Sequence, residues 1–350
     1  MPDIPFDLLR GPYLCDLLDQ PRAMAETVDR LSPQPQLKTL RRDLREGRYR
    51  RLVLTGMGSS HLILHPLHIR LTQSGFDSIM VETSELLYAM PRLLTRQSIV
   101  IAVSQSGASA ETVRMLEQSG GRPFIIGVTN TEGSSLARKA GLALFTHAGE
   151  ETGVSCKTAL TAMALLHWAG EHLSGGNLKT ARRDLEKLAP AMDTYLFTWQ
   201  EHVRSLWPVL EGVEHFFAVG RGRSLAAAGL GGLTLKESTH VHSEGMSSSA
   251  FRHGPFEMLG PGMFVLVFDG DPVVSPMNRR LLRDVLRTGA RAALCGWKGA
   301  QGLFALPAVP DSVRPIVEAL PQQMASLALA GLHGRQPGRF ERISKVTTVE

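Results

Sequence analysis

The chain has 350 residues, enough for two domains of common size whose hydrophobic cores need no disulfides or metal ions for stability. Hydrophobic residues make up 43% and charged residues 20%, as in an ordinary globular protein, and the net charge of +5 is spread over basic residues that alternate with Asp, Glu and Leu. The excess positive charge suits a small anionic ligand as well as it suits a polymer. The aromatic residues, 6% of the chain, are not interleaved with the clusters of basic residues, which argues against a nucleic-acid partner.

The three cysteines, Cys15, Cys156 and Cys295, are too few and too scattered for a disulfide framework or a CxxC metal site. The N-terminus lacks the charged and apolar regions of a signal peptide, and no later stretch stays apolar for the roughly 18 residues of a membrane span. We therefore expect a cytoplasmic protein without a membrane partner.

An N-terminal segment with helix-like spacing of apolar residues covers residues 1–45. Short apolar runs then alternate with helical segments, which is typical of a parallel sheet covered on both faces. The predicted strands of this half are residues 52–54, 79–81, 99–103, 124–126 and 143–145. A long apolar helix over about 157–172 follows, with further helix to about Trp207, and we assign residues 46–195 to a first α/β domain.

The strand and helix pattern restarts in the second half of the chain, with apolar runs and a closing helix at residues 216–219, 264–268, 292–295 and 321–333. Both halves open with a strand followed by Gly-x-Gly-x-Ser, at residues 52–60 and 216–224, which indicates an internal duplication. We predict two tandem, doubly wound parallel-sheet domains, the second over residues 196–335, followed by a C-terminal tail over 336–350.

Residues 104–107, Ser-Gln-Ser-Gly, lie directly after a predicted strand and before a helix-like stretch that begins near Glu111. Hydroxyls, backbone N–H groups and a helix N-terminus converge at such a point, which is how an α/β protein builds an anion site. A simpler interpretation is that Ser106 caps the helix and Gly107 turns the chain. The second half has Asp-Gly-Asp-Pro at 269–272 instead, so only the first half keeps a complete candidate phosphate loop.

Residues 56–61, Gly-Met-Gly-Ser-Ser-His, are similar to a dinucleotide-binding motif. The third glycine of that motif is missing, and His61 is too bulky for the close packing that it permits. Ser59 and Ser60 instead supply hydroxyls at the carboxyl end of a strand, where open α/β sheets bind ligands. Another hydroxyl-rich turn, residues 149–156, precedes the long helix and is a further candidate anion-facing helix start.

The densest group of reactive side chains lies in the second half. Glu237 ends an apolar helix of small residues, so partial burial would raise the pKa of its carboxyl group toward the range of a general base; the alternative is a surface ion pair. His253, fixed before Gly-Pro, is a candidate for proton transfer, whereas we interpret His240 and His242 as ordinary loop or core histidines. A metal site from these histidines and Glu244 is not expected, because no second ligand cluster has a recognised spacing.

Eight short segments, taken in chain order, resemble the double sugar isomerase (SIS) domain family. They are residues 20–23, 58–60, 104–107, 153–155, 220–222, 235–237, 253–255 and 345–350. The similarity covers nearly the whole chain and is greatest to the isomerase half of glucosamine-6-phosphate synthase. It implies two flavodoxin-like SIS domains that act on a sugar phosphate without a cofactor.

The resemblance also implies roles for individual residues. The phosphate of a hexose 6-phosphate would be held by Ser60, Ser104, Gln105, Ser106 and Ser109, with the backbone of Val154, Ser155 and Cys156 closing over the sugar. Glu237 would move a proton between C1 and C2, while His253 would assist ring opening from the neighbouring subunit of a homodimer. Lys345, on the C-terminal tail, would form an imine with the open-chain ketose.

Two departures from the synthase limit what it can suggest here. The synthase begins with a glutaminase domain, and this chain has neither that domain nor a cysteine before Cys15, so we do not expect it to take ammonia from glutamine by that route. The synthase also has a lysine one helical turn before its catalytic glutamate, where this chain has Thr234, and the adjacent Lys236 should point elsewhere.

These observations favour a deaminase that converts glucosamine 6-phosphate to fructose 6-phosphate and ammonia. A fructosamine-6-phosphate deglycase and a ketose-phosphate isomerase are alternatives within the same enzyme class. A non-catalytic sugar-phosphate sensor is the alternative from another class, and the joint presence of Glu237, His253 and Lys345 favours catalysis over it.

Overall fold

The computed structural model describes residues 4–296, 302–342 and 345. Its contacts divide the chain into two compact units, which we treat one at a time. The first-sheet unit comprises Arg22–Glu151, Lys157–Lys187 and Arg342–Glu350, and the second-sheet unit comprises Met1–Pro21, Thr152–Cys156 and Leu188–Glu341.

The first-sheet unit is built on a parallel five-stranded sheet in the order β2-β1-β3-β4-β5. Its strands are β1 (Arg51–Gly56), β2 (Ser78–Glu82), β3 (Ser98–Val103), β4 (Phe124–Thr129) and β5 (Leu142–Phe145). The apolar run of β3 is buried along its whole length, as a strand covered on both faces must be. The chain reverses its direction of winding between β1 and β3, and open sheets of this order bind ligands beyond the carboxyl ends of these strands.

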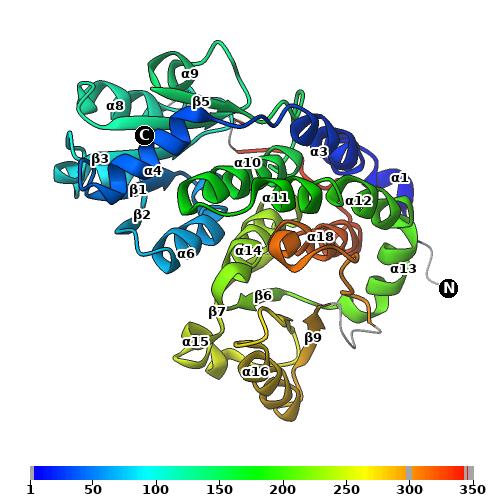
Figure 1. Cartoon of the computed structure of the whole chain (residues 1–350). Coiled ribbons are helices and arrows are strands. Elements are labelled where there is room, and N and C mark those ends of the chain that lie inside the picture. The colour runs from blue at the N-terminus through cyan, green and yellow to red at the C-terminus, as the bar shows by residue number, and fades with distance from the viewer. Residues whose placement is uncertain (1–3, 297–301, 343–344, 346–350) are drawn as a thin grey trace. The chain divides into compact units, whose positions relative to one another are not determined.

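Helices cover both faces of the first sheet (Figure 1). The helices of this unit are α3 (Gln20–Asp29), α4 (Pro35–Arg45), α5 (Ser59–Leu62), α6 (His65–Gln73), α7 (Thr83–Tyr88), η1 (Pro91–Leu93), α8 (Ala110–Ser119), α9 (Ser135–Lys139), α10 (Lys157–Ser174) and α11 (Leu178–Leu185). On one face, α7, α8 and α9 pack on alternate strand residues such as Val53 and Val100. Helices α4 and α6 pack against α10, which is buried on almost every side and is accordingly apolar all round.

The second-sheet unit repeats this winding with a parallel sheet in the order β7-β6-β8-β9. Its strands are β6 (His215–Gly220), β7 (His242–Ser247), β8 (Met263–Phe268) and β9 (Arg291–Cys295). Its longer helices are α2 (Pro12–Leu18), α12 (Leu188–Phe197), α13 (Trp199–Leu210), α14 (Leu225–Thr239), α16 (Ser275–Arg287) and α18 (Leu320–Leu332). The short helices are α1 (Phe6–Leu9), η2 (Gly222–Ser224), α15 (Ser248–Arg252), η3 (Pro255–Met258), η4 (Asp311–Val313) and α17 (Arg314–Val317). In Figure 1, α14 and α18 lie on one side of β6, and α15 and α16 on the other.

The prediction of two doubly wound parallel-sheet domains is confirmed, and the matching strand orders agree with an internal duplication. Strand β7 was not expected, because its sequence, His-Ser-Glu-Gly-Met-Ser, contains no apolar run. It forms because α14 packs on it backbone to backbone: a Cβ atom at Gly245 would collide with the carbonyl oxygen of Ala228, and one at Gly232 with the backbone of Gly245. This packing explains the alanines and glycines in the first half of α14.

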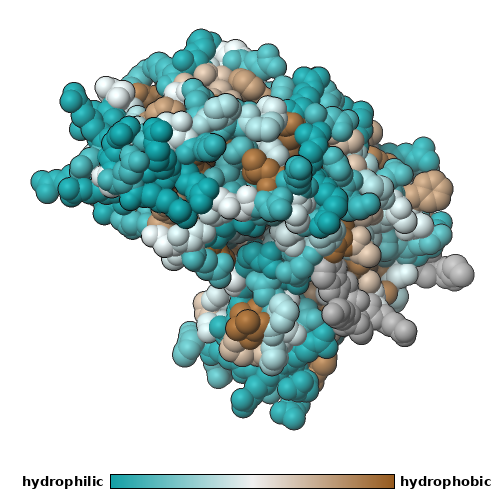
Figure 2. Space-filling model, viewed as in Figure 1, coloured by the Kyte–Doolittle hydropathy of each residue, from teal (hydrophilic) through white to brown (hydrophobic). Residues whose placement is uncertain are grey.

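The described residues form no large continuous apolar surface in the view of Figure 2. Only a few large apolar side chains are strongly exposed, with Phe197 and Val273 the most exposed of them. Figure 2 shows small, separate apolar patches on a largely hydrophilic face. Within the described parts of the chain, no helix has both the length and the apolar character needed to cross a membrane.

Candidate functional site

Residues 104–109 form a tight loop between β3 and α8 in the first-sheet unit. Ser104, which is 8% exposed, donates its backbone N–H to Val128 (3.0 Å), and its side-chain Oγ accepts from the backbone N–H of Gly107 (3.1 Å). Gly107 has a φ of +60°, and a Cβ atom there would collide with the side chain of Ser134. Only glycine fits this position without strain, so the loop is a preformed turn.

The helix cap of this loop is Ser109 rather than Ser106. Ser109 Oγ accepts from the backbone N–H of Thr112 (3.4 Å), whereas Ser106 Oγ accepts from the backbone N–H of Ala108 (3.3 Å) inside the loop. The interpretation that Ser106 only caps a helix is therefore wrong, because α8 begins four residues further on. Ser106, Ser109 and Gln105 are all partly exposed in front of the N-terminus of α8, where the helix dipole favours an anion.

Ser59 and Ser60 begin α5 directly after β1. The chain bends sharply there, since Gly58 has a φ of +51° and a Cβ atom at Gly56 would lie 2.8 Å from the backbone of Ser60. Both serines are partly buried at the carboxyl end of β1, and β3 is the neighbouring strand in the sheet. The two serines and the loop 104–109 therefore lie at the same edge of the sheet, as the sequence predicts.

A hydrogen-bond chain joins the loop after β5 to the loop 104–109. The carbonyl oxygen of Gln105 accepts from the backbone N–H of Asn130 (2.9 Å), which follows β4. Asn130 Nδ2 donates to the carbonyl oxygen of Gly149 (2.7 Å), and its Oδ1 accepts from the backbone N–H of Ala148 (2.9 Å). Sequence reasoning missed Asn130; its signal is a single amide side chain directly after an apolar strand.

Glu151 lies in the same loop, and its side chain is fully buried. Its carboxylate accepts from the backbone N–H and the hydroxyl of Thr158 in the first turn of α10, at 3.1 and 2.6 Å. It also forms an ion pair with Lys345 Nζ at 2.7 Å. Lys345, predicted to be functional from the family resemblance, thus lies in the first-sheet unit, as the loop 104–109 does. Glu151 was not among the predicted site residues, although it lies in the hydroxyl-rich turn 149–156.

The predicted sugar-covering segment, Val154 to Cys156, belongs to the second-sheet unit. Val154 and Cys156 are buried and Ser155 is partly exposed. The carboxylate of Asp16 in α2 accepts from the backbone N–H of Thr152 (3.2 Å), which anchors the start of the segment.

Glu237 lies in the last turn of α14 in the second-sheet unit and is partly buried, as expected. Thr234, one turn earlier, is buried with 7% exposure, and Lys236 is exposed, so these two side chains do point in different directions. His253 is exposed at the C-terminal end of α15, before Gly254.

The other histidines of this region are exposed rather than buried. His240 ends α14 in the left-handed conformation, and His242 lies in β7 rather than in a loop. His242 contacts His215 (3.3 Å) and Glu244 (3.6 Å). Among the residues that the structure describes, no group of three or more His, Cys, Asp and Glu side chains is arranged to hold a metal ion.

Ion pairs close the corresponding edge of the second sheet. Arg223 takes the place of Ser59 in the repeat and pairs with Asp271, which also pairs with Arg314 (2.5 Å). Arg314 reaches the buried Glu318 at 3.1 Å. Burial opposes ionisation of Asp271, but its hydrogen bonds and the charges of both arginines lower its pKa below the ordinary value, and burial raises the pKa of Glu318. The arginines at this edge are therefore already paired with carboxylates of the same unit, whereas the corresponding edge of the first sheet is lined with hydroxyl groups.

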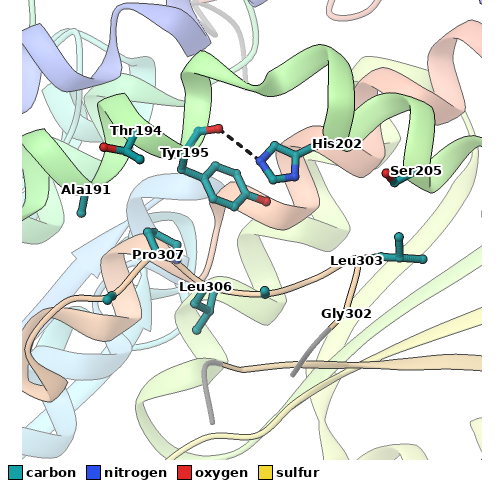
Figure 3. Close-up of a pocket in the computed structure, with 11 residues that line it drawn as sticks. Ala191, Thr194, Tyr195, His202, Ser205, Gly302, Leu303, Leu306 and Pro307 are labelled. Carbon is teal, nitrogen blue, oxygen red and sulfur yellow. Dashed lines mark hydrogen bonds between the residues drawn. The ribbon is translucent and has the colours of Figure 1, made fainter. Parts of the chain in front are cut away.

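A cavity of about 750 Å³ lies in the second-sheet unit between α12, α13 and residues 302–308. Figure 3 shows Tyr195 and His202 side by side in its wall, with ring centroids 4.2 Å apart and His202 Nε2 donating to the carbonyl oxygen of Tyr195 (3.2 Å). Burial lowers the pKa of His202, which favours the neutral ring. None of the described residues that line the cavity is Lys, Arg, Asp or Glu, so these residues offer no charged partner to a phosphate.

The chain is similar in sequence to known proteins. The chain is 30% identical over 358 residues to glutamine–fructose-6-phosphate aminotransferase (isomerizing) of Thermococcus kodakarensis, and 29% identical over 357 residues to that of Pyrococcus horikoshii. Each alignment covers 96% of this chain, but the chain spans only 58% and 57% of those two proteins.

Solved structures share the fold. The C-terminal domain of glucosamine-fructose-6-phosphate aminotransferase from Francisella tularensis has a TM-score of 0.83 at 22% identity, covering 94% of this chain and 98% of that one. Glucosamine-6-phosphate deaminase from Thermotoga maritima has a TM-score of 0.75 at 17% identity, covering 97% and 100%. The model of the SIS domain matches residues 48–170 and again 210–331, one copy in each half, and the chain therefore belongs to the SIS domain family.

Proposed function

We propose that this chain is an aldose–ketose isomerase acting on an aminated hexose 6-phosphate. In its proposed reaction, glucosamine 6-phosphate and water give fructose 6-phosphate and ammonia. The observation that carries the proposal is the preformed Ser-Gln-Ser-Gly loop at the switch point of the first sheet, in a chain of the SIS family. The names of its relatives, an aminotransferase and a deaminase of hexose 6-phosphates, support the substrate class.

The phosphate would bind at the first sheet. Ser104, Ser106 and Ser109 supply hydroxyls there, and the ten-residue α8 adds a helix N-terminus. Ser59 and Ser60 add hydroxyls from the neighbouring strand end. The corresponding edge of the second sheet pairs its arginines with its own carboxylates, so we propose a single phosphate site per chain.

The chemical step that we assign to Glu237 is transfer of a carbon-bound proton. In the open-chain sugar the proton on C2 is acidified by the neighbouring C1 carbonyl, and a carboxylate can take it and return it to C1. The partial burial of Glu237 favours this role, because loss of water makes a carboxylate a stronger base. The product of this shift from glucosamine 6-phosphate is an imine at C2.

Lys345 and His253 complete the proposed chemistry. The amine of Lys345 would displace ammonia from the C2 imine and form its own imine, which water then hydrolyses to fructose 6-phosphate and the free lysine. His253, exposed at the end of a short helix, would transfer a proton during ring opening. We propose that it acts in the site of the other subunit of a homodimer, as the family resemblance implies.

A substrate screen tests this function. Wild-type protein is incubated with glucosamine 6-phosphate, fructosamine 6-phosphate and unaminated aldose and ketose 6-phosphates, and both ammonia release and ketose formation are measured. We expect ammonia and fructose 6-phosphate in equal amounts from glucosamine 6-phosphate, and neither with Glu237→Gln. Activity confined to fructosamine 6-phosphate or to unaminated sugars would identify a deglycase or a plain isomerase. Tight binding without turnover of any of them would identify a sensor.

A further inference from the structure

The buried carboxylate of Glu151 holds Lys345 at a fixed place in the first-sheet unit. We propose that Glu151 is the positioning residue of the imine-forming lysine, binding its cation before and after the covalent step. This inference rests on the proposed function, because it takes Lys345 as the amine that reacts with the ketose.

Burial and hydrogen bonds hold the side chain of Glu151 in one place. Its side chain has no exposure to solvent, and Thr158 donates to it through both the backbone N–H (3.1 Å) and the hydroxyl (2.6 Å). Both donors lie in the first turn of α10, where the helix dipole also favours a negative charge. A carboxylate held in this way loses little freedom when it binds a cation.

Lys345 meets this carboxylate from a distant part of the sequence, 194 residues away. Its Nζ lies 2.7 Å from Glu151 Oε2, and the lysine side chain is 22% exposed to solvent. The contact is therefore short and largely shielded, and charge-assisted hydrogen bonds of this kind are the strong ones. The exposed fraction leaves part of the lysine accessible to a ligand.

The contact lies at the edge of the sheet that carries the phosphate loop. Glu151 lies in the loop after β5, and Asn130 joins this loop at Gly149 to the phosphate loop at Gln105. β4 and β5 are parallel neighbours, so their carboxyl ends point to the same edge. An amine fixed by Glu151 is therefore on the ligand-binding side of the unit.

Glu151 can stabilise the positive charge on Lys345 both before and after the imine forms. The ammonium of Lys345 first passes one proton to Glu151, 2.7 Å away, and the free amine forms the N–C bond with the ketone carbon to give a carbinolamine. Glu151 returns the proton to the carbinolamine hydroxyl, the C–O bond breaks and water leaves, so that the ammonium before the step and the protonated imine after it both carry a charge of +1 on nitrogen. The carboxylate thus has a cationic partner on both sides of this step. A neutral side chain in its place would stabilise both cations less.

Borohydride trapping tests the inference, because hydride converts the protonated imine to a stable secondary amine. Each protein is mixed with fructose 6-phosphate and borohydride, and the adduct on Lys345 is quantified by peptide mass spectrometry. The affinity for glucitol 6-phosphate, which has no carbonyl group and forms no imine, is measured by calorimetry. The variants are Glu151→Gln, which removes the charge at nearly equal shape, Glu151→Asp, which keeps it, and the exposed neighbour Glu150→Gln as matched control.

We expect the trapping rate to fall about 10- to 100-fold in Glu151→Gln, the range for loss of one charge-assisted hydrogen bond. Glu151→Asp should recover part of the rate, Glu150→Gln should match wild type, and glucitol 6-phosphate should bind all four proteins equally. Unchanged trapping in Glu151→Gln, or equal losses in the Gln and Asp variants, would overturn the inference alone. So would a parallel loss of glucitol 6-phosphate binding in Glu151→Gln, which would mean that Glu151 supports the whole unit. No adduct on Lys345 of wild type would instead overturn the imine role within the proposed function, and the inference with it.

Discussion

Replacement of Gly107 by alanine should destabilise the loop 104–109 by more than the strain of its left-handed conformation alone. The residue has a φ of +60°, and an alanine in the left-handed region costs about 1–2 kcal/mol. The new Cβ atom would also collide with the side chain of Ser134, and overpacking of this kind costs about 1–3 kcal/mol more. We therefore expect Gly107→Ala to lower the free energy of unfolding by about 2–5 kcal/mol.

Gly120→Ala is the matched control for this experiment. Gly120 ends α8 with a φ of +54°, and nothing lies within 4 Å of a Cβ atom built there. This variant should lose only the conformational part, about 1–2 kcal/mol, and keep its affinity for glucitol 6-phosphate. Urea denaturation and calorimetry of both variants provide the comparison. Equal stability of the two variants, or equal affinity for the ligand, would refute the view that the loop is closely packed and preformed.

The remaining predictions concern the ligand, the subunits and acid stability. Glucosamine 6-phosphate should bind far more tightly than glucosamine in calorimetry, and Ser106→Ala should reduce that difference; equal affinities would remove the phosphate assignment. Inactive Glu237→Gln and His253→Ala proteins should regain activity when mixed under subunit exchange, whereas no recovery despite proven exchange would mean that one chain builds the whole site. Asp271 should stabilise its unit fully above its unfolded pKa of about 3.8, and less as the pH falls through its lowered folded value. The stability gap between wild type and Asp271→Asn should therefore narrow below pH 4 in acid titrations; a constant gap would contradict this assignment.

The sequence predicts the sheets well because most of their strands are buried on both faces. Such strands are continuous apolar runs, and those of β3 and β8 are visible without any structural information. Strand β7 could not be recognised in this way, since its place in the sheet depends on the contact of Gly245 with α14, which only the folded chain shows.

The candidate site could be predicted where its residues are adjacent in the sequence. The loop of Ser104 to Gly107 carries its own signal, because strand, hydroxyls, glycine and helix follow one another directly. Glu151 has no such signal: its partner Lys345 is far away in the chain, and a glutamate beside the exposed Glu150 in a polar turn looks like a surface residue. The pairing of Asp271 with Arg223 and Arg314 likewise depends on three separate segments.

The central claim is that Glu237 moves a carbon-bound proton of a sugar phosphate, and isotope exchange tests it most directly. Wild-type protein is incubated with glucosamine 6-phosphate in heavy water, and deuterium at C1 and C2 is followed by NMR. We expect exchange in wild type and a rate lower by about 10²- to 10⁴-fold in Glu237→Gln, the usual effect of losing a general base, with ligand affinity unchanged. A wild-type protein that binds the sugar phosphate tightly and shows neither deuterium exchange nor ammonia release would contradict the claim.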